Sequence, residues 1–475
     1  MSTDREPVSE DPILGALLSE PEPSAAEVLK GEPPDQSDVG TPVAGHSAVQ
    51  DVSLKRPLSV LQVLGPGLIT GASDDDPSGI GTYSQVGSQF GYGLLWLALF
   101  TFPLMAAVQE MCARIALHTG VGLGLSLRRK FPTWLVGVCI LALFLANTIN
   151  IGADLGAVAS GVSLLTHGTV PAIWLVIPVA LLILALQVFA TYALIFKIFK
   201  WLTLALFAYV ATALFAHPNI GQVVRATFVP HIELSNAFIA ALVAVFGTTI
   251  SPYLFFWQAS SEVDEMKAAG LSTEAARRGV KLSELRAARL DIFTGMLFSN
   301  VVMYFIILTS SAVLHAHGQT NIQSAAQAAS ALEPLAGQYA VILFALGMIG
   351  SGLLAIPILS GSAAYAAKEF LHIPGTLANK PRFRPTFYLI IALATLAGVA
   401  MNFLHIDPIK ALFITAVING LVAPPLLVLI VLLAADRAVM KERVSGLLSK
   451  VLTWGATAVM GTAALALVVT TVHPI

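Results

Sequence analysis

The chain has 475 residues, of which 56% are hydrophobic and 11% charged, and its mean hydropathy is +0.79. This composition is typical of membrane proteins with many spans, and it excludes a soluble fold, which needs more polar residues to cover its surface. The formal net charge of −2 gives no support for nucleic-acid binding.

The first part of the chain differs from the rest in composition. Residues 1–51 are rich in Glu, Asp, Pro and Ser, which predicts a disordered tail. No basic segment precedes a short apolar stretch there, so we expect no cleaved signal peptide. We therefore divide the chain into an N-terminal tail, 1–55, and a membrane domain, 56–475.

Eleven stretches of the membrane domain are long and apolar enough to cross a bilayer as helices, which takes about 20 residues each. They cover residues 58–83, 92–117, 133–160, 171–190, 194–216, 236–260, 289–315, 338–366, 386–404, 409–434 and 450–472. The sequence therefore predicts an all-α membrane protein. Only short segments separate the fourth stretch from its neighbours on either side.

Lys and Arg are concentrated in alternate connections between these stretches. They gather at 128–130, 197–200, 267–289, 368–384 and 437–450, while the connection over 316–338 has none. Because basic loops stay in the cytoplasm, the N-terminus is predicted to be cytoplasmic and the C-terminus extracellular. We expect the membrane to be the cell membrane of a bacterium. The segment from Glu262 to Arg289 is predicted to form a helical linker on the cytoplasmic membrane surface.

An acidic interruption divides the first apolar stretch. Asp74, Asp75 and Asp76 are followed by Pro77 and by small residues. A carboxylate at bilayer depth costs several kcal/mol and persists mainly where it meets a cation or a proton. The proline removes a backbone donor and lets the helix open toward a cavity. This pattern predicts a broken helix that holds a cation-transport site.

The sixth stretch carries a similar interruption, from Gly247 through Thr248 and Ser251 to Pro252. Two broken helices five spans apart are expected of two inverted repeats that unwind near the bilayer midplane to form the site. We therefore place repeat one at 58–216, repeat two at 236–434 and an extra helix at 450–472. The alternative is a pair of ordinary proline kinks.

Residues 65–132 resemble the first two helices of the Nramp divalent-metal transporters. The family patterns recur in order as Gly65-Pro66-Gly67, Asp76-Pro77, the FGYGLLW stretch from Phe90, and the segment from Gln109 to Gly120. The resemblance implies a LeuT-type fold of five plus five helices with broken helices one and six. It also implies a transporter of divalent metal ions, with no enzyme activity and no cofactor besides the transported ion.

The chain departs from the Nramp pattern at the positions that the family uses to bind the metal ion and to move protons. Gly79 replaces the asparagine ligand, Ser251 the methionine ligand and Tyr253 a histidine. Asp154 is kept in the third span, but Ala157 replaces the glutamate that the family associates with proton movement. This combination is similar to the Nramp-related magnesium transporters.

Losing the methionine sulfur leaves oxygen ligands, which suit hard ions such as Mg²⁺, and the glycine is expected to widen the cavity. Asp76 is the first candidate ligand. The resemblance adds the Gly79 position, and Ser73, one turn before Asp76, adds its carbonyl. Thr248 and Ser251 are candidates for metal contacts through hydroxyl, carbonyl or water, the alternative being ordinary contacts between helices. Accessory candidates are Asp74 and Asp75, expected to face an aqueous vestibule or to be solvated end charges, together with Asp154 and Asn419.

The sequence thus favours import of Mg²⁺ and Mn²⁺ without proton coupling, with metal ions and the lipid bilayer as partners and no protein partner identified. The alternative is a proton-coupled Mn²⁺ or Fe²⁺ symporter, since Asp76 and Asp154 remain. Amino-acid transport on the same fold is disfavoured because three carboxylates would repel the substrate carboxylate. No motif of a membrane-embedded enzyme is found. His315 and His317 are interpreted as loop residues.

Overall fold

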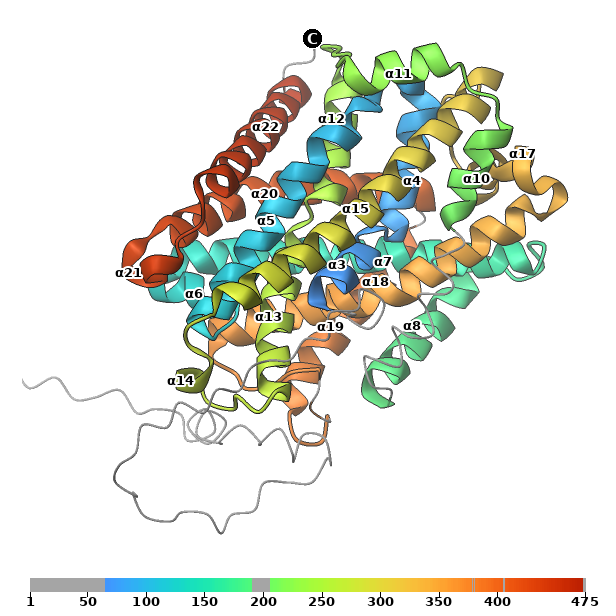
Figure 1. The fold of residues 1–475 in the computed structure, drawn as a ribbon. Helices are drawn as coiled ribbons and strands as arrows, with labels where there is room; N and C mark the ends of the chain where they lie inside the picture. Colours follow the sequence, from blue (N-terminus) through green and yellow to red (C-terminus); the bar gives the residue numbers. More distant parts are fainter. Residues whose placement is uncertain (1–64, 190–205, 378, 380, 405, 473–475) are drawn as a thin grey trace, which may run out of the picture.

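The computed structural model describes residues 65–189, 206–377, 379, 381–404 and 406–472, which form helices and their connections with no β-strand among them (Figure 1). The predicted tail, 1–55, lies outside the described residues. The helices of the first half are α3 (Pro66–Asp74), α4 (Pro77–Phe90), η1 (Gly91–Leu94), α5 (Trp96–Thr119), α6 (Leu123–Lys130), α7 (Thr133–Leu165), α8 (Ala172–Phe189), α10 (Phe207–Phe215) and α11 (Ile220–Phe228).

The second half begins with another broken pair. Its helices are α12 (Asn236–Thr249), α13 (Pro252–Ala268), α14 (Glu274–Arg277), α15 (Leu282–Val313), η3 (His315–His317), α16 (Ala325–Ala329), η4 (Ser330–Leu332), α17 (Glu333–Ala336), η5 (Gly337–Tyr339), α18 (Ala340–Leu371), α19 (Pro385–Met401), η6 (Asn402–Leu404), α20 (Pro408–Ala435), α21 (Arg437–Met440), η7 (Lys441–Arg443) and α22 (Leu447–Val472).

Among the described residues, 9 helical segments are long and apolar enough to cross a membrane. They correspond to the predicted spans two to four and six to eleven. The first predicted span is present but divided into α3 and α4, and most of the fifth lies outside the described residues. The total of eleven spans stays a prediction.

The sequence predicts one helical linker on the membrane surface over residues 262–289, between spans six and seven. The structure differs from this prediction. α13 continues to Ala268, α15 already begins at Leu282, and only the four-residue α14 lies between them. Gly270 and Gly279 adopt φ of 93° and 87°, a left-handed conformation that ends helices and favours glycine. The charged residues of this segment therefore extend two membrane helices instead of forming a third.

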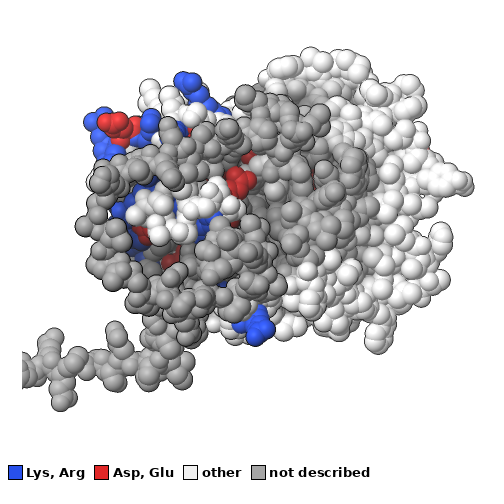
Figure 2. Space-filling model, turned by 60° about the horizontal axis from the view of Figure 1, so that its bottom comes forward, with Lys and Arg blue, Asp and Glu red and all other residues white. Residues whose placement is uncertain are grey.

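The basic connections predicted to share one side of the membrane do contact one another. Arg129 of α6 bonds Glu274 of α14, Lys130 pairs with Asp436 before α21, and Arg128 bonds the Phe370 carbonyl at the end of α18. The visible charged side chains gather in one part of the face in Figure 2. These bonds place four predicted inside connections on a common face.

Close helix packing surrounds the two broken helices. A Cβ on Gly71 of α3 would lie 2.1 Å from the Gly295 carbonyl oxygen of α15, and one on Gly247 of α12 would lie 2.0 Å from the Ala416 carbonyl oxygen of α20. Small residues permit such backbone approach in membrane helices. By contrast, α8, α19 and α22 expose many large apolar side chains, as expected of helices that face lipid.

Candidate metal site at the two helix breaks

The first break separates α3 from α4 at Asp75 and Asp76. Asp76 has an extended backbone and caps α4: its Oδ1 accepts hydrogen bonds from the Gly79 amide at 2.7 Å and the Ser78 hydroxyl at 2.8 Å. Pro77 occupies the first helical position, where its missing amide hydrogen costs nothing. The local sequence thus starts a new helix inside the span and leaves the Asp76 carboxylate at its N-terminus, where negative charge is favoured.

The second break separates α12 from α13 at Ile250 and Ser251. Pro252 again occupies the first position of the new helix. The Ser251 hydroxyl lies 2.8 Å from each of the carbonyl oxygens of Gly247 and Thr248, which share its one proton. Ser251 therefore satisfies carbonyl groups that the end of α12 leaves without helical partners.

The two breaks face each other. The Tyr253 hydroxyl of α13 donates to the Ser73 carbonyl oxygen of α3 at 2.9 Å, and a Cβ on Gly79 would lie 3.1 Å from Thr248 Oγ1. Two segments far apart in the sequence thus bring Ser73, Asp76, Gly79 and Thr248 together at one place. Thr248 Oγ1 is buried and makes no hydrogen bond among the described residues.

Gly79 does not open the wide space that the sequence interpretation expected. Its Cβ position is enclosed by Thr248 Oγ1 at 3.1 Å, Tyr83 Cε2 at 3.2 Å and the Asp74 carbonyl oxygen at 3.4 Å. In this conformation the glycine allows Thr248 of α12 to approach α4 closely, and the ring of Tyr83, from the next turn of α4, lies beside it. The volume of the lost asparagine side chain is taken up by neighbouring side chains.

Helix α7 contributes a residue that the sequence interpretation missed. Asn150 is buried and its Nδ2 donates to Asp76 Oδ2 at 3.0 Å. Asp154, one helical turn later, is also buried, and neither of its carboxylate oxygens has a hydrogen-bond partner in the described part of the chain. Asn147, Asn150 and Asp154 share one helix face, so polar periodicity within this apolar span was a usable indication.

Asp74 and Asp75 are not solvated end charges, because their side chains are 0% and 1% exposed. The Ser299 hydroxyl of α15 lies 2.6 Å from Asp74 Oδ2 and 3.1 Å from Asp75 Oδ1. A hydroxyl has one proton, so Ser299 donates fully to only one of them. The second oxygen of each carboxylate has no partner among the described residues.

Four carboxylates are therefore buried near the two breaks: Asp74, Asp75, Asp76 and Asp154. Within the described ranges, no Lys, Arg or His forms an ion pair or hydrogen bond with any of them. The described residues also contain no group of three or more His, Cys, Asp or Glu side chains that could hold a metal ion. The arrangement thus offers single carboxylates surrounded by neutral oxygen donors.

Asn419 and two histidines of the loop around η3 are the remaining residues that the sequence singled out. Asn419 of α20 is buried with both amide atoms unpartnered among the described residues, and it adjoins Gly420, where α20 packs on α12. His315 and His317 each bond a backbone carbonyl oxygen, of Ser88 and Val313 respectively, so these two side chains serve the loop around η3.

Comparisons with known proteins agree with this architecture. Residues 67–470 match the family model described as natural resistance-associated macrophage protein-like, or Nramp. The chain is 25% identical to the divalent metal cation transporter MntH of Pectobacterium carotovorum subsp. carotovorum (strain PC1), over 85% of this chain and 92% of that one. It is 27% identical to MntH of Yersinia pestis (strain Pestoides F), over 71% and 81%.

Solved structures share the fold. A mutant of the Eremococcus coleocola manganese transporter superposes with a TM-score of 0.65 at 18% identity, over 86% of this chain and 87% of that one. Mhp1, a nucleobase-cation-symport-1 family transporter, gives 0.53 at 14% identity, over 87% and 94%. The predicted LeuT-type fold with two broken helices is thereby confirmed. Since the family model matches nearly all of the membrane domain, this chain belongs to the Nramp family.

Proposed function

We propose that this protein imports Mg²⁺ and Mn²⁺ through a cell membrane by alternating access around Asp76. The observation that carries the proposal is the buried Asp76 carboxylate at the meeting point of both helix breaks, whose partners are all neutral. A carboxylate in that position is stabilised by a cation that arrives and leaves. Relatives named as divalent metal and manganese transporters support the substrate class.

Oxygen donors around Asp76 support hard ions as substrates. The Thr248 hydroxyl is unpartnered, and the Ser73 carbonyl and Ser251 hydroxyl keep lone pairs beside the hydrogen bonds they make. Mg²⁺ is usually held through one or two carboxylates while it keeps several waters, and Mn²⁺ accepts the same ligands. Ser251 supplies no sulfur, which would favour softer metals.

A proton-coupled Mn²⁺ or Fe²⁺ symporter is the second candidate, and Asp154 is the observation that favours it. Its carboxylate is buried without a partner in the described part of the chain, one turn from Asn150, which bonds Asp76. A buried, unpaired acid is the kind of group that carries a proton in transporters.

Purified protein in liposomes tests the proposal. We expect uptake of both Mg²⁺ and Mn²⁺, and Asp76→Ala should abolish uptake without unfolding the protein because it removes the charge between the breaks. Glu333→Ala, which removes an exposed carboxylate of α17, is the matched control and should transport normally. Mn²⁺ uptake without Mg²⁺ uptake, and without competition by millimolar Mg²⁺, would contradict the Mg²⁺ assignment.

We also propose that the face carrying the basic connections is cytoplasmic, which places the N-terminus inside and the C-terminus outside. Single cysteines replacing Arg286 and Gln319 in a chain whose own two cysteines are buried provide the test. A membrane-impermeant thiol reagent added to intact cells should label position 319 and leave position 286 unlabelled. The reverse pattern would invert the topology.

A further inference from the structure

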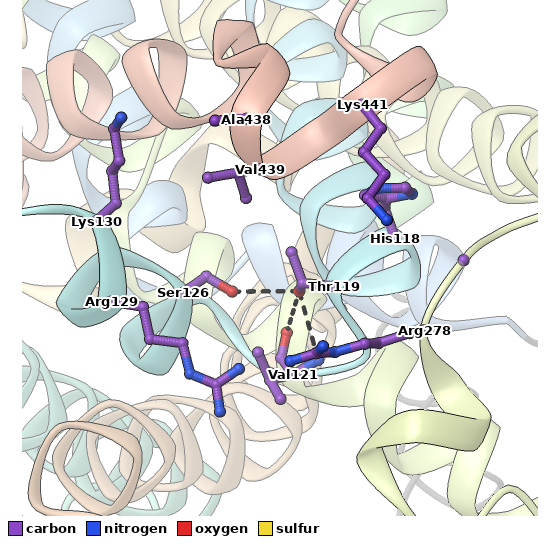
Figure 3. A pocket seen from close by; sticks show the side chains of 11 residues that line it. His118, Thr119, Val121, Ser126, Arg129, Lys130, Arg278, Ala438, Val439 and Lys441 are labelled. Carbon is purple, nitrogen blue, oxygen red and sulfur yellow. Dashed lines mark hydrogen bonds between the residues drawn. The ribbon is translucent and has the colours of Figure 1, made fainter.

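A cavity of about 450 Å³ lies away from the helix breaks, where the basic connections meet. The C-terminal end of α5, the helix α6, the connection after α14 and the segment α21–η7 form its walls (Figure 3). Thr119 and Ser126 place their hydroxyl groups between the walls, 3.2 Å apart. The volume falls within the range of roughly 300–1,000 Å³ that small-molecule sites occupy.

The charged side chains that line the cavity are all basic. Arg129, Lys130, Arg278 and Lys441 line it, and none of its described lining residues is acidic. Two carboxylates outside the lining partly balance these residues: Glu274 bonds Arg129 and Arg278, and Asp436 pairs with Lys130. Three of the four basic side chains thus share two acidic partners, and the partial negative charges at the C-terminal ends of α5 and α6 offset only part of the excess.

The ion pairs beside the cavity persist at physiological pH. The hydrogen bonds from Arg129 hold the pKa of Glu274 to about 2, and the bond from Lys130 lowers the pKa of Asp436. Both acids are therefore already fully ionised, so the surplus positive charge is not an effect of protonated carboxylates. The basic members of these pairs are exposed, at 46% for Arg129 and 38% for Lys130, so the pairs contribute little energy and their cations remain available to a stronger anionic partner.

Lys441 combines an unbalanced charge with a strained backbone. In the described part of the chain it forms no ion pair, and it lines the cavity next to His118. Its φ of 47° and ψ of −121° are a conformation that favours glycine and costs other residues of order 1–3 kcal/mol. The strained backbone position is thus occupied by the lysine that adds a positive charge, unpaired among the described residues, to the cavity lining.

We propose that this cavity binds a phosphate-bearing anion through Lys441, Arg278, Arg129 and Lys130. Arginine forks and lysine ammonium groups are the usual partners of phosphate oxygens, and basic pockets between membrane helices on the cytoplasmic side bind anionic head groups. A single anion in this cavity would join α5, α6, the α14–α15 connection and η7. The phosphate can belong to a soluble compound or to the head group of a lipid.

The test uses the full-length protein and the variant Lys441→Gly/Arg278→Gln. Lys441→Gly relieves the backbone conformation while removing the charge, so the melting temperature should not fall because of that substitution. Arg278→Gln leaves the Arg129–Glu274 pair intact. Arg286→Gln removes an exposed positive charge from the first turns of α15, outside the cavity lining, and is the matched control.

Two arms distinguish the source of the phosphate. In the first, calorimetry in detergent and metal-free buffer measures pyrophosphate binding. In the second, native mass spectrometry measures cardiolipin retained from mixed cardiolipin and phosphatidylcholine nanodiscs. Binding in either arm by the parent and by Arg286→Gln, weakened at least tenfold in Lys441→Gly/Arg278→Gln and reduced by salt, supports the site and identifies its source. Binding in neither arm, or equal binding by all three proteins, would overturn the proposal.

Discussion

Asn150 donates to the Asp76 oxygen that does not cap α4, so it fixes the orientation of the carboxylate from a third helix. Side chains that orient a ligand in this way typically affect metal affinity by about 10–100-fold. We therefore expect Asn150→Ala to weaken Mg²⁺ and Mn²⁺ binding by roughly that factor. Binding is measured by calorimetry on purified protein.

Asn147→Ala is the control for that experiment. Asn147 lies on the same face of α7, but its amide donates to the Leu359 carbonyl oxygen at 3.2 Å instead of to Asp76. The control should retain metal affinity. If both variants bind metal like the parent, Asn150 has no influence on the site.

The enclosed position of Gly79 makes a second prediction at the scale of single residues. A methyl group there meets Thr248 Oγ1 at 3.1 Å, so Gly79→Ala should lower the free energy of unfolding by about 1–3 kcal/mol. Thr248→Ala removes that oxygen, and the double variant should recover part of the loss. A thermal-unfolding mutant cycle in metal-free buffer measures this coupling, and strictly additive effects would show that the two positions are independent.

The contacts around Gly79 also affect what happens when the residues of the Nramp pattern are restored. An asparagine at position 79 has to displace Thr248 or Tyr83 before it reaches a metal. We expect Gly79→Asn with Ser251→Met to shift preference from Mg²⁺ toward Mn²⁺, because it restores an amide and a thioether ligand. Adding Thr248→Ala should strengthen the shift. An unchanged ratio of Mg²⁺ to Mn²⁺ uptake in a folded triple variant would place these positions outside the metal site.

The sequence predicted residues whose chemistry is conspicuous in an apolar span, such as Asp76 and Ser251 beside their prolines. It did not predict Asn150 or Ser299, which reach the acidic break from other helices. Nor did it predict that Gly79 is enclosed. These features depend on which faces of the helices pack against one another. The composition of a single segment does not determine this packing.

At the scale of secondary-structure elements, helix α3 contacts helix α15 at two places. The Asp291 carboxylate of α15 accepts hydrogen bonds from the Gly67 amide at 2.7 Å and the Leu68 amide at 3.2 Å, so a neighbouring helix caps α3. One turn later, Gly71 packs against the Gly295 backbone. Local sequence showed where both spans break, because each carries a proline that starts a new helix, but it gave no sign of this long-range cap.

Asp291→Ala should loosen α3. Hydrogen bonds to a charged group contribute about 1.5–3 kcal/mol each, so amide exchange in residues 67–74 should accelerate by about tenfold or more. Hydrogen exchange followed by mass spectrometry measures this. Thr294→Ala, at an exposed position three residues away on α15, should leave the exchange unchanged. Equal exchange in both variants would show that Asp291 does not hold α3.

At the scale of the whole molecule, the distribution of charge separates three regions. Buried carboxylates lie at the breaks, basic connections bond one another on a common face, and large apolar side chains cover α8, α19 and α22. Counting Lys and Arg predicted which connections share a side, because that pattern is set by the membrane. Which ion crosses, and with what coupling, depends on the few groups at the breaks.

We expect metal entry without a stoichiometric proton flux. Ala157 stands where the family pattern has a glutamate, and Tyr253, which stands where it has a histidine, donates its hydroxyl to the Ser73 carbonyl oxygen. Asp154 thus lacks the glutamate and the histidine of the family pattern. The membrane potential acts on both charges of the metal ion and suffices to drive uptake into a negative interior.

Liposomes with an internal pH dye test this expectation. Mg²⁺ uptake should proceed at equal internal and external pH, should increase when a negative-inside potential is imposed, and should leave the dye signal constant. Asp154→Asn should change the rate of uptake without creating or removing proton movement, since the acid then acts only through its charge. Acidification that follows metal uptake in the parent and is absent with Asp76→Ala would instead assign the chain to the proton-coupled symporters. In that case Asp154 is the carrier, because neither of its carboxylate oxygens has a hydrogen-bond partner among the described residues.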